Sequence, residues 1–333
     1  MQLHEHRPTL AWFGDAVAGV APGRPEAARA PLPGLARYKV LRLVGAGGMG
    51  QVYQALDTVL ERHVALKVMR SDVPVGERRR FRREALLGAR LLHPGLVRVY
   101  DMGMMGGEKP ADPGDDRERE AGWMAMEYLP GTDLLRLLEG ARAKGHGLPW
   151  AALLRVFVQV LGALQYCHDC RVVHRDVKPA NMFVTRDPNT RFLTTKLLDL
   201  GIAHDLDGPA ATGKVEVLCG DPNYMAPEQT RANTQIDPRA DIYAMGMSLY
   251  ELTTGVLPFE SLLDAPLATL LTAQREAEPD PPSRWLPAST PPELAQRIDQ
   301  LFARACAKRP ESRFQTAKEM LAAIQAPLGQ SLD

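Results

Sequence analysis

The sequence predicts an α+β protein in which a strand-rich first part is followed by a mainly helical second part. β-forming runs separated by short turns lie between Tyr38 and Met69. A further run of this kind, Trp123 to Leu129, ends at Pro130-Gly131, which we interpret as the boundary between the two parts. From Leu134 onward, apolar residues recur at the spacing of amphipathic helices.

Composition excludes several classes of partner. The chain has 333 residues, of which 45% are hydrophobic, so it can bury a substantial core. Lys plus Arg equals Asp plus Glu at 40 each, and this balance indicates neither nucleic acid nor an anionic membrane as a partner. We find no uninterrupted apolar run of about 18 residues and no secretory pattern. With four cysteines and no disulfide framework, the expectation is a soluble, cytoplasmic chain.

Changes in composition divide the chain into four parts. Residues 1–36 are rich in Ala, Pro and Gly, and we expect a flexible leader, with surface docking as the alternative. Residues 37–129 form the strand-rich part, and Gly, Pro and mixed charge in residues 103–122 predict a solvated insertion, with a binding role as the alternative. Residues 130–326 form the helical part, and residues 327–333 form a short tail.

Three glycines follow the first β-forming run. Gly45, Gly47 and Gly50 make a G-x-G-x-x-G pattern, which dinucleotide-binding folds also use. In those folds the glycines lead into a helix, whereas here Val52 and Tyr53 are β-formers. The pattern therefore predicts a hairpin that folds over phosphates, because backbone N–H groups without nearby Cβ atoms can approach anionic oxygens.

Lys67 lies in the middle of an apolar β-forming run. A buried lysine is costly without a partner, so we expect an anion and a carboxylate nearby. The helix predicted from Val75 to Leu92 places Glu84 where it can point back at Lys67. Pairing of Glu84 with Arg80, four residues earlier on the same helix, is the alternative.

A polar loop, His174 to Asn181, places three chemically useful side chains within eight residues. Asp176 is a candidate base for a hydroxyl proton, and Lys178 can neutralise charge on a transferred phosphoryl group. Asn181 offers an oxygen to a hard cation. Asp199, near the end of a predicted apolar strand from Lys196 to Gly201, is a second candidate magnesium ligand.

Cys167-His168-Asp169-Cys170 raises the question of a zinc site. Zinc sites of this type need a second pair of ligands, and Cys219 and Cys306 stand alone. The sequence favours a helix end with incidental cysteines.

The order of these motifs resembles the eukaryotic-type protein kinase family from Tyr38 to Ile324. Further motifs follow in the family's order at Ala226-Pro227-Glu228, Asp241 and Arg313. The resemblance implies a bilobal protein-kinase fold, with a small antiparallel N-lobe sheet and one long helix before a larger, mainly α-helical C-lobe. It also implies ATP with Mg²⁺, for which Mn²⁺ is a possible substitute.

The resemblance assigns expected roles to individual residues. Lys67 contacts the α and β phosphates and pairs with Glu84, Asp176 deprotonates the acceptor hydroxyl, and Asn181 and Asp199 hold magnesium. The remaining nucleotide contacts are expected at Val44, Gly45, Gly47, Gly50, Val52, Ala65, Met126, Glu127, Leu129, Asp133 and Phe183. Glu228 is expected to pair with Arg313.

Lys178, two residues after Asp176, is typical of the family's serine/threonine kinases. The sequences of two stretches, Phe81 to Glu84 and Tyr224 to Gln229, are most similar to those of the bacterial members. The resemblance therefore implies protein substrates with Ser or Thr hydroxyls, a role in bacterial signalling, and autophosphorylation. A homodimer is compatible with the sequence.

Two departures from the family pattern occur between Asp199 and Glu228. The family usually has Thr where this chain has Asp221, whose carboxylate could pair with Lys178 and repel Asp176. A restrained kinase or an ATP-binding pseudokinase scaffold is therefore the alternative to an ordinary kinase.

The second departure is that Thr212 is the only Ser or Thr in this segment. A phosphate on Thr212 could bind Arg175 and order the segment. Asp205, Asp207 or Glu216 could instead satisfy Arg175, which would make phosphorylation unnecessary.

Overall fold

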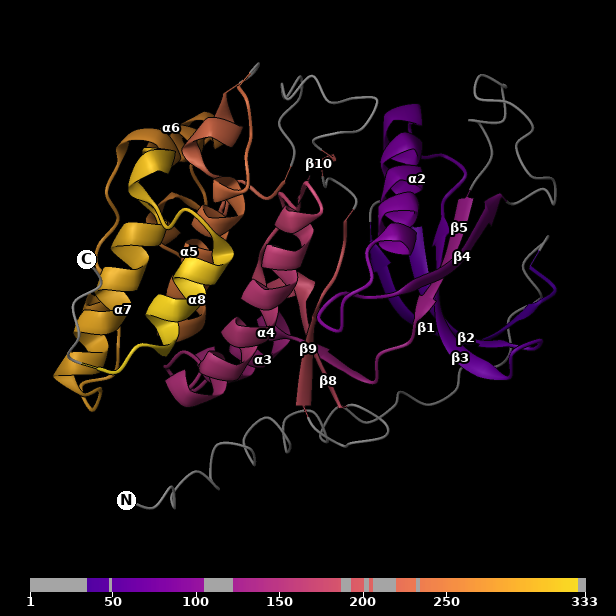
Figure 1. The fold of residues 1–333 in the computed structure, drawn as a ribbon, viewed down its shortest axis with the longest axis horizontal. Coiled ribbons are helices and arrows are strands. Elements are labelled where there is room, and N and C mark those ends of the chain that lie inside the picture. The colour runs from indigo at the N-terminus through magenta and orange to yellow at the C-terminus, as the bar shows by residue number, and fades with distance from the viewer. Residues whose placement is uncertain are drawn as a thin grey trace. The chain divides into compact units, whose positions relative to one another are not determined.

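The computed structural model of the chain describes residues 35–47, 50–104, 122–186, 193–200, 204–205, 220–231 and 234–328. These residues fall into two compact units, divided between Pro130 and Gly131. Figure 1 shows the elements of each unit, which are described one unit at a time. The expected leader up to residue 34 and residues 105–121 of the expected insertion lie outside the described residues.

The first unit is built on a five-stranded antiparallel sheet in the order β1-β2-β3-β5-β4. Its elements are β1 (Tyr38–Gly47), β2 (Gly50–Asp57), β3 (Arg62–Met69), α2 (Val75–Arg90), β4 (Val99–Met104) and β5 (Gly122–Glu127). β4 includes Gly103 and Met104 and β5 starts at Gly122, so the strands extend into the insertion expected at 103–122.

Helix α2 packs on this sheet through one apolar stripe. Phe81 and Ala85 are buried in a cluster with Met124 of β5. At Gly88, a Cβ atom would lie 2.5 Å from the Val99 side chain, so this position requires glycine for close approach to β4. The helix ends at Arg90, two residues before the predicted end, because Leu91 is already extended.

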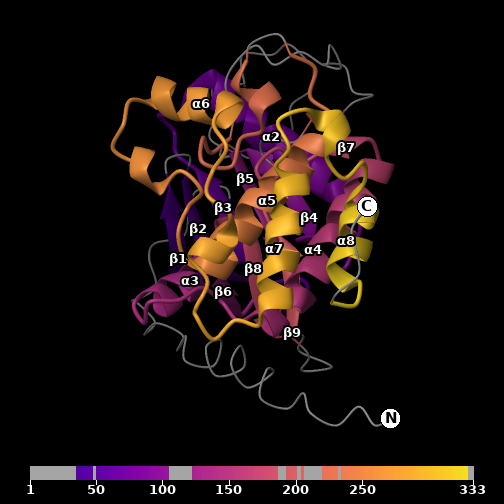
Figure 2. The same cartoon turned by 90° about the vertical axis from the view of Figure 1, so that its left-hand side faces the viewer.

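The second unit is mainly helical. Its helices are α3 (Leu134–Arg142), α4 (Trp150–Asp169), α5 (Arg239–Thr254), α6 (Leu267–Glu276), α7 (Pro292–Ala305) and α8 (Ala317–Gln325). Figure 2 shows α5 beside α7 and α4 beside α8. Every residue of α5 after Arg239 is buried, so this helix forms the centre of the unit. The predicted α+β class, with strands first and helices second, is confirmed.

Short strands complete the second unit. β6 (Gly131–Asp133), β8 (Met182–Arg186) and β9 (Leu193–Leu197) form one sheet, and β7 (Val172–Val173) pairs with β10 (His204–Asp205). The strand predicted from Lys196 to Gly201 is wrong at its end, because β9 stops at Leu197. Asp199 has a positive φ of 60°, which no extended strand accommodates.

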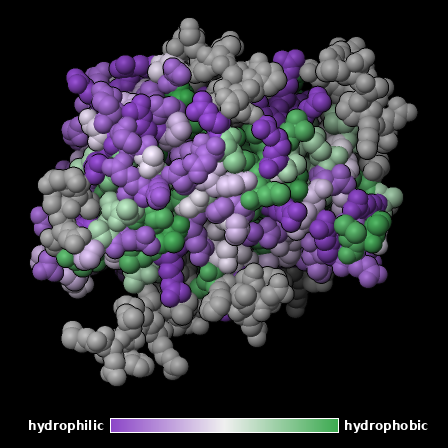
Figure 3. Space-filling view, in the orientation of Figure 1, coloured by the Kyte–Doolittle hydropathy of each residue, from purple (hydrophilic) through white to green (hydrophobic). Residues whose placement is uncertain are grey.

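Within the described ranges, α4 is the one helix long and apolar enough to cross a membrane. Half of its apolar window is buried inside the second unit, where it packs against α8 and β9. Core helices of globular units commonly pass the same test, so the evidence for a membrane span is weak. The face in Figure 3 shows hydrophilic residues with smaller hydrophobic patches between them.

Candidate active site

The glycine motif joins β1 and β2, as the sequence predicts. Gly47 pairs with Gly50, and the two residues between them lie outside the described residues. A Cβ atom at Gly50 would lie 2.2 Å from the Val68 carbonyl oxygen of β3, so only glycine fits. Cβ atoms at Gly45 and Gly47 would meet open space, so packing within the chain does not explain these two glycines.

Several of the expected nucleotide contacts in the first unit share one face of the sheet. The register places Gly45 opposite Val52, Val52 opposite Lys67, and Ala65 opposite Met126. Directly opposed residues point to the same side of an antiparallel sheet, and residues two apart on a strand do so as well. These five side-chain positions therefore share one face.

Three further expected contacts of the first unit lie at a strand irregularity, at a strand end and just after that end. Val44 is exposed and lies in a register irregularity of β1 between Leu43 and Gly45. Glu127 ends β5 and its N–H donates to the Arg98 carbonyl at 2.8 Å. Leu129 follows in the segment before the boundary and is half-buried.

The expected pairing of Lys67 with Glu84 is confirmed. Lys67 Nζ lies 2.7 Å from Oε1 and 2.8 Å from Oε2 of Glu84, so the ammonium group binds both carboxylate oxygens. The side chains are 15% and 9% exposed, and each charge therefore depends on the other for solvation. Arg80 pairs with Glu77 at 2.6 Å, one turn earlier on α2.

In the second unit, the loop after β7 brings Asp176, Lys178 and Asn181 together. Asp176 Oδ2 accepts a hydrogen bond from Asn181 Nδ2 at 2.8 Å and lies 3.1 Å from Lys178 Nζ. Asn181 Nδ2 also donates to the Asp176 backbone carbonyl at 2.8 Å. Two donors on one oxygen fix the orientation of the carboxylate, as a positioned proton acceptor requires.

The buried carboxylate of Asp241, on α5, holds the start of this loop. It accepts hydrogen bonds from the backbone N–H groups of His174 at 2.9 Å and Arg175 at 2.8 Å, and it contacts His168 Nε2 at 2.8 Å. Burial alone would raise the pKa of Asp241, but these partners outweigh burial and lower the pKa below its usual value. A charged anchor inside the unit therefore fixes the backbone just before Asp176.

The expected metal ligands are joined through the backbone. The Leu198 N–H donates to the Asn181 carbonyl at 2.8 Å, so Asp199 follows directly after a residue bonded to Asn181. Because the Asn181 amide nitrogen donates to Asp176, the Oδ1 atom is the side-chain atom left to ligate a cation. A carboxylate and an amide oxygen suit Mg²⁺, which takes few protein ligands and completes its shell with substrate phosphates and water. The donor set fits magnesium.

Asp133 and Phe183 are direct neighbours in the register of β6 and β8. Asp133 also begins α3, where its carboxylate accepts a hydrogen bond from the Arg136 N–H at 2.9 Å. The structure thus brings these two expected nucleotide contacts together on one short sheet.

Asp221 pairs with Lys178, as expected from the sequence. Lys178 Nζ lies 3.8 Å from Asp221 Oδ2 and 3.1 Å from Asp176 Oδ2, so one ammonium group contacts two carboxylates. Each carboxylate weakens the positive potential that Lys178 presents to another anion.

The expected ion pair between Glu228 and Arg313 is also confirmed. Arg313 is fully buried and donates to both Glu228 oxygens, at 2.7 Å and 2.8 Å. Gly201, Thr212 and the side chains of Asp205, Asp207 and Glu216 lie outside the described residues.

The cysteine pair lies at a helix end, as predicted. α4 ends at Asp169, with Cys170 as its C-terminal cap. Burial raises the pKa of the Cys167 thiol to about 12, which disfavours the thiolate that a zinc ligand needs. Groups of three or more His, Cys, Asp or Glu side chains suited to a metal do not occur in the part of the chain that the structure describes.

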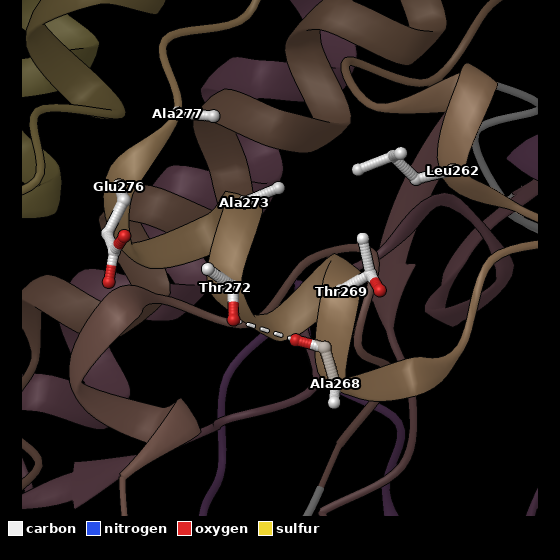
Figure 4. A pocket seen from close by; sticks show the side chains of 7 residues that line it. All are labelled: Leu262, Ala268, Thr269, Thr272, Ala273, Glu276 and Ala277. Atoms are coloured by element: carbon white, nitrogen blue, oxygen red, sulfur yellow. Dashed lines mark hydrogen bonds between the residues drawn. The ribbon is translucent and has the colours of Figure 1, made fainter.

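A hollow of about 570 Å³ lies along α6 (Figure 4). It is lined by Leu262, Ala268, Thr269, Thr272, Ala273, Glu276 and Ala277. None of the sequence-predicted site residues lines it, so we assign the chemistry to the loop around Asp176.

Comparison with known proteins agrees with this geometry. The protein kinase domain model matches residues 38–324, and the chain therefore belongs to the protein kinase family. The fold resembles the crystal structure of the PknI kinase domain from Mycobacterium tuberculosis with a TM-score of 0.63 and 29% identity, covering 89% of this chain and 98% of that one. The expected bilobal kinase fold class is confirmed.

Curated relatives are bacterial serine/threonine-protein kinases. The chain is 38% identical to pkn3 of Myxococcus xanthus, 35% to PknF of Mycobacterium tuberculosis and 35% to PrkC of Bacillus subtilis. These alignments cover 87%, 88% and 87% of this chain, and 50%, 57% and 40% of the relatives. The chain thus spans about half the length of these relatives.

Proposed function

We propose that the chain is an ATP-dependent serine/threonine protein kinase that phosphorylates protein hydroxyls in bacterial signalling, itself included. The observation that carries the proposal is the cluster around Asp176. One carboxylate oxygen contacts both the Asn181 amide at 2.8 Å and the Lys178 ammonium at 3.1 Å. A base, a cation ligand and a neutralising charge in one fixed loop are what phosphoryl transfer to a hydroxyl needs.

The residues of the second unit have distinct roles in the proposed reaction. Asp176 accepts the proton of the acceptor hydroxyl. The hydroxyl oxygen bonds to the γ-phosphorus of ATP, and the bond between the γ-phosphorus and the bridging oxygen of the β-phosphate breaks. Lys178 stabilises the negative charge of the transferred group. Asn181 and Asp199 would hold Mg²⁺, or Mn²⁺ in its place, and the cation would supply positive charge to the phosphates.

The residues of the first unit hold the nucleotide in the proposal. Lys67, oriented by Glu84, binds the α and β phosphates, and the backbone N–H groups of Gly45, Gly47 and Gly50 approach the phosphates. The adenine ring lies on the sheet face that carries Val52, Ala65 and Met126.

The partners in this proposal are proteins with accessible Ser or Thr residues, and the site of action is the cytoplasm, where ATP is abundant. We propose no nucleic-acid partner, because cationic and anionic residues balance at 40 each. Self-phosphorylation is compatible with a homodimer in which one copy presents a hydroxyl to the other.

Transfer of labelled phosphate tests the proposal. The chain is incubated with radiolabelled ATP, Mg²⁺ and a generic protein substrate, beside Asp176→Asn and the matched control Asp264→Asn, which alters an exposed carboxylate. We expect wild type and Asp264→Asn to label the substrate and Asp176→Asn to lose at least about 99% of the rate. Equal labelling by wild type and Asp176→Asn would favour the pseudokinase scaffold.

A further inference from the structure

Gln274 has no role in the assignments above, yet its side chain joins two parts of the second unit. It lies on α6 and is fully buried. Its Nε2 atom donates to the backbone carbonyls of Pro222 and Asn223, each at 3.0 Å. Its Oε1 atom accepts a hydrogen bond from the Tyr243 hydroxyl at 2.7 Å.

A carboxamide is the side chain that satisfies all three partners. The two carbonyls only accept, so they require an NH₂ group with two hydrogens, and the Tyr243 hydroxyl then donates to the remaining oxygen. A carboxylate at position 274 would face two carbonyl oxygens, and an apolar side chain would leave both carbonyls without this donor. The identity of Gln274 therefore matches the Pro222–Asn223 turn.

The main chain of Gln274 is also held in place. Lys308 Nζ donates to its carbonyl at 3.1 Å and lies 5.9 Å and 5.5 Å from the ring centres of Tyr243 and Phe259. The hollow in Figure 4 lies along other residues of α6, at Thr272, Ala273 and Glu276. α6 thus presents Gln274 to the turn from a fixed backbone.

The turn that Gln274 holds carries Asp221. The Asp221 carboxylate accepts from the N–H and side-chain amide of Asn223, both at 3.1 Å, and its backbone carbonyl accepts from the Tyr224 N–H at 3.0 Å. The same carboxylate lies 3.8 Å from Lys178, which lies 3.1 Å from Asp176. A chain of direct contacts therefore runs from the turn to the proposed base.

We propose that Gln274 is a positioning residue for the protein acceptor, an inference that rests on the proposed kinase activity. A hydroxyl deprotonated by Asp176 must lie within hydrogen-bond reach of it, so the polypeptide that bears the hydroxyl lies against the neighbouring turn. Gln274 fixes the Pro222–Asn223 backbone there and acts on the reaction through that backbone. Water as an acceptor needs no such surface.

Two reactions of the same protein separate this role from a general loss of structure. Gln274→Met keeps an unbranched side chain but removes both donors. We expect its KM for a protein substrate to rise about tenfold, while its KM for ATP and its rate of ATP hydrolysis without acceptor stay within about twofold of wild type. A defect in folding would lower both reactions together.

The matched control is Tyr243→Phe, which removes the hydrogen bond to Oε1 and leaves both Nε2 donors. Hydrogen–deuterium exchange of the peptide covering residues 220–226 reports on the turn without any need for activity. We expect faster exchange in Gln274→Met and near wild-type exchange and protein KM in Tyr243→Phe.

Either of two results would overturn the inference: exchange in Gln274→Met that matches Tyr243→Phe, or ATP hydrolysis that falls in parallel with protein phosphorylation. A wild type without any transfer that depends on Asp176 would refute the proposed function instead. In that case the exchange data alone decide whether Gln274 fixes the turn.

Discussion

Replacing Asp221 by asparagine removes a negative charge 3.8 Å from Lys178 while keeping an oxygen that can accept from Asn223. Two unit charges about 4 Å apart attract by about 1 kcal/mol in water and by about 4 kcal/mol at an effective dielectric constant of about 20. The Lys178 and Asp221 side chains are 22% and 31% exposed, so solvent screening keeps the effect near the lower value.

Without Asp221, Lys178 can stabilise the transferred phosphoryl group by about 1 kcal/mol more in the transition state. A barrier lower by this amount would raise kcat about fivefold. Asp221→Thr, which restores the residue usual in the family, should change kcat in the same direction. Initial rates at saturating ATP and protein substrate measure the effect, and Asp264→Asn controls for net charge at an exposed site. Unchanged or lower kcat in both Asp221 variants, at unchanged Tm, would show that Asp221 does not restrain Lys178.

Three further predictions concern other parts of the chain. Glu84→Ala leaves the Lys67 ammonium without its carboxylate, so kcat/KM for ATP should fall at least about tenfold, with Lys67→Met similar in a kinase assay. Hydrogen bonds from Arg37 lower the pKa of Asp57 to about 2 from 3.8, so the stability that they contribute is present above pH 4 and lost as pH falls toward 2; denaturant titrations should show this loss in wild type and less in Asp57→Asn. Arg171 has φ of 62°, so Arg171→Ala should have a free energy of unfolding about 1 kcal/mol lower than Arg171→Gly in denaturant titrations, because both variants lose the same side-chain contacts and alanine is strained at positive φ.

Residues that belong to local motifs could be predicted from the sequence. Lys67 is a charged residue in an apolar strand and therefore needs a carboxylate partner. The sequence predicts Glu84 as that partner, and the structure places Glu84 Oε1 2.7 Å from Lys67 Nζ. Asp176 and Asn181 are five residues apart, so their contact follows from a single tight loop. In such cases the chemistry of a side chain and its spacing along the chain are enough to predict its partner.

Gln274 could not be found in this way. Leu270 and Leu271 are buried beside it, and the spacing Leu267, Leu270, Leu271, Gln274 fits one helical face. The partners of the Gln274 amide nitrogen are backbone carbonyls 52 and 51 residues earlier, which no pattern of side chains reveals. The one signal was a polar residue on an apolar stripe, and it indicates a buried partner without identifying it.

The same limit applies to the backbone on both sides of the loop around Asp176. Arg175 and Asp199 have φ angles of 68° and 60°, in a region that costs non-glycine residues roughly 1 kcal/mol or more. Arginine does not signal this conformation in the sequence, and aspartate is only enriched in it among non-glycine residues. It persists because Asp241 binds the Arg175 N–H at 2.8 Å and the residue before Asp199 donates to the Asn181 carbonyl at 2.8 Å. The buried Asp241 carboxylate on α5 therefore fixes the backbone just before the proposed base, and loss of Asp241 should disturb catalysis without any change in the loop's own residues.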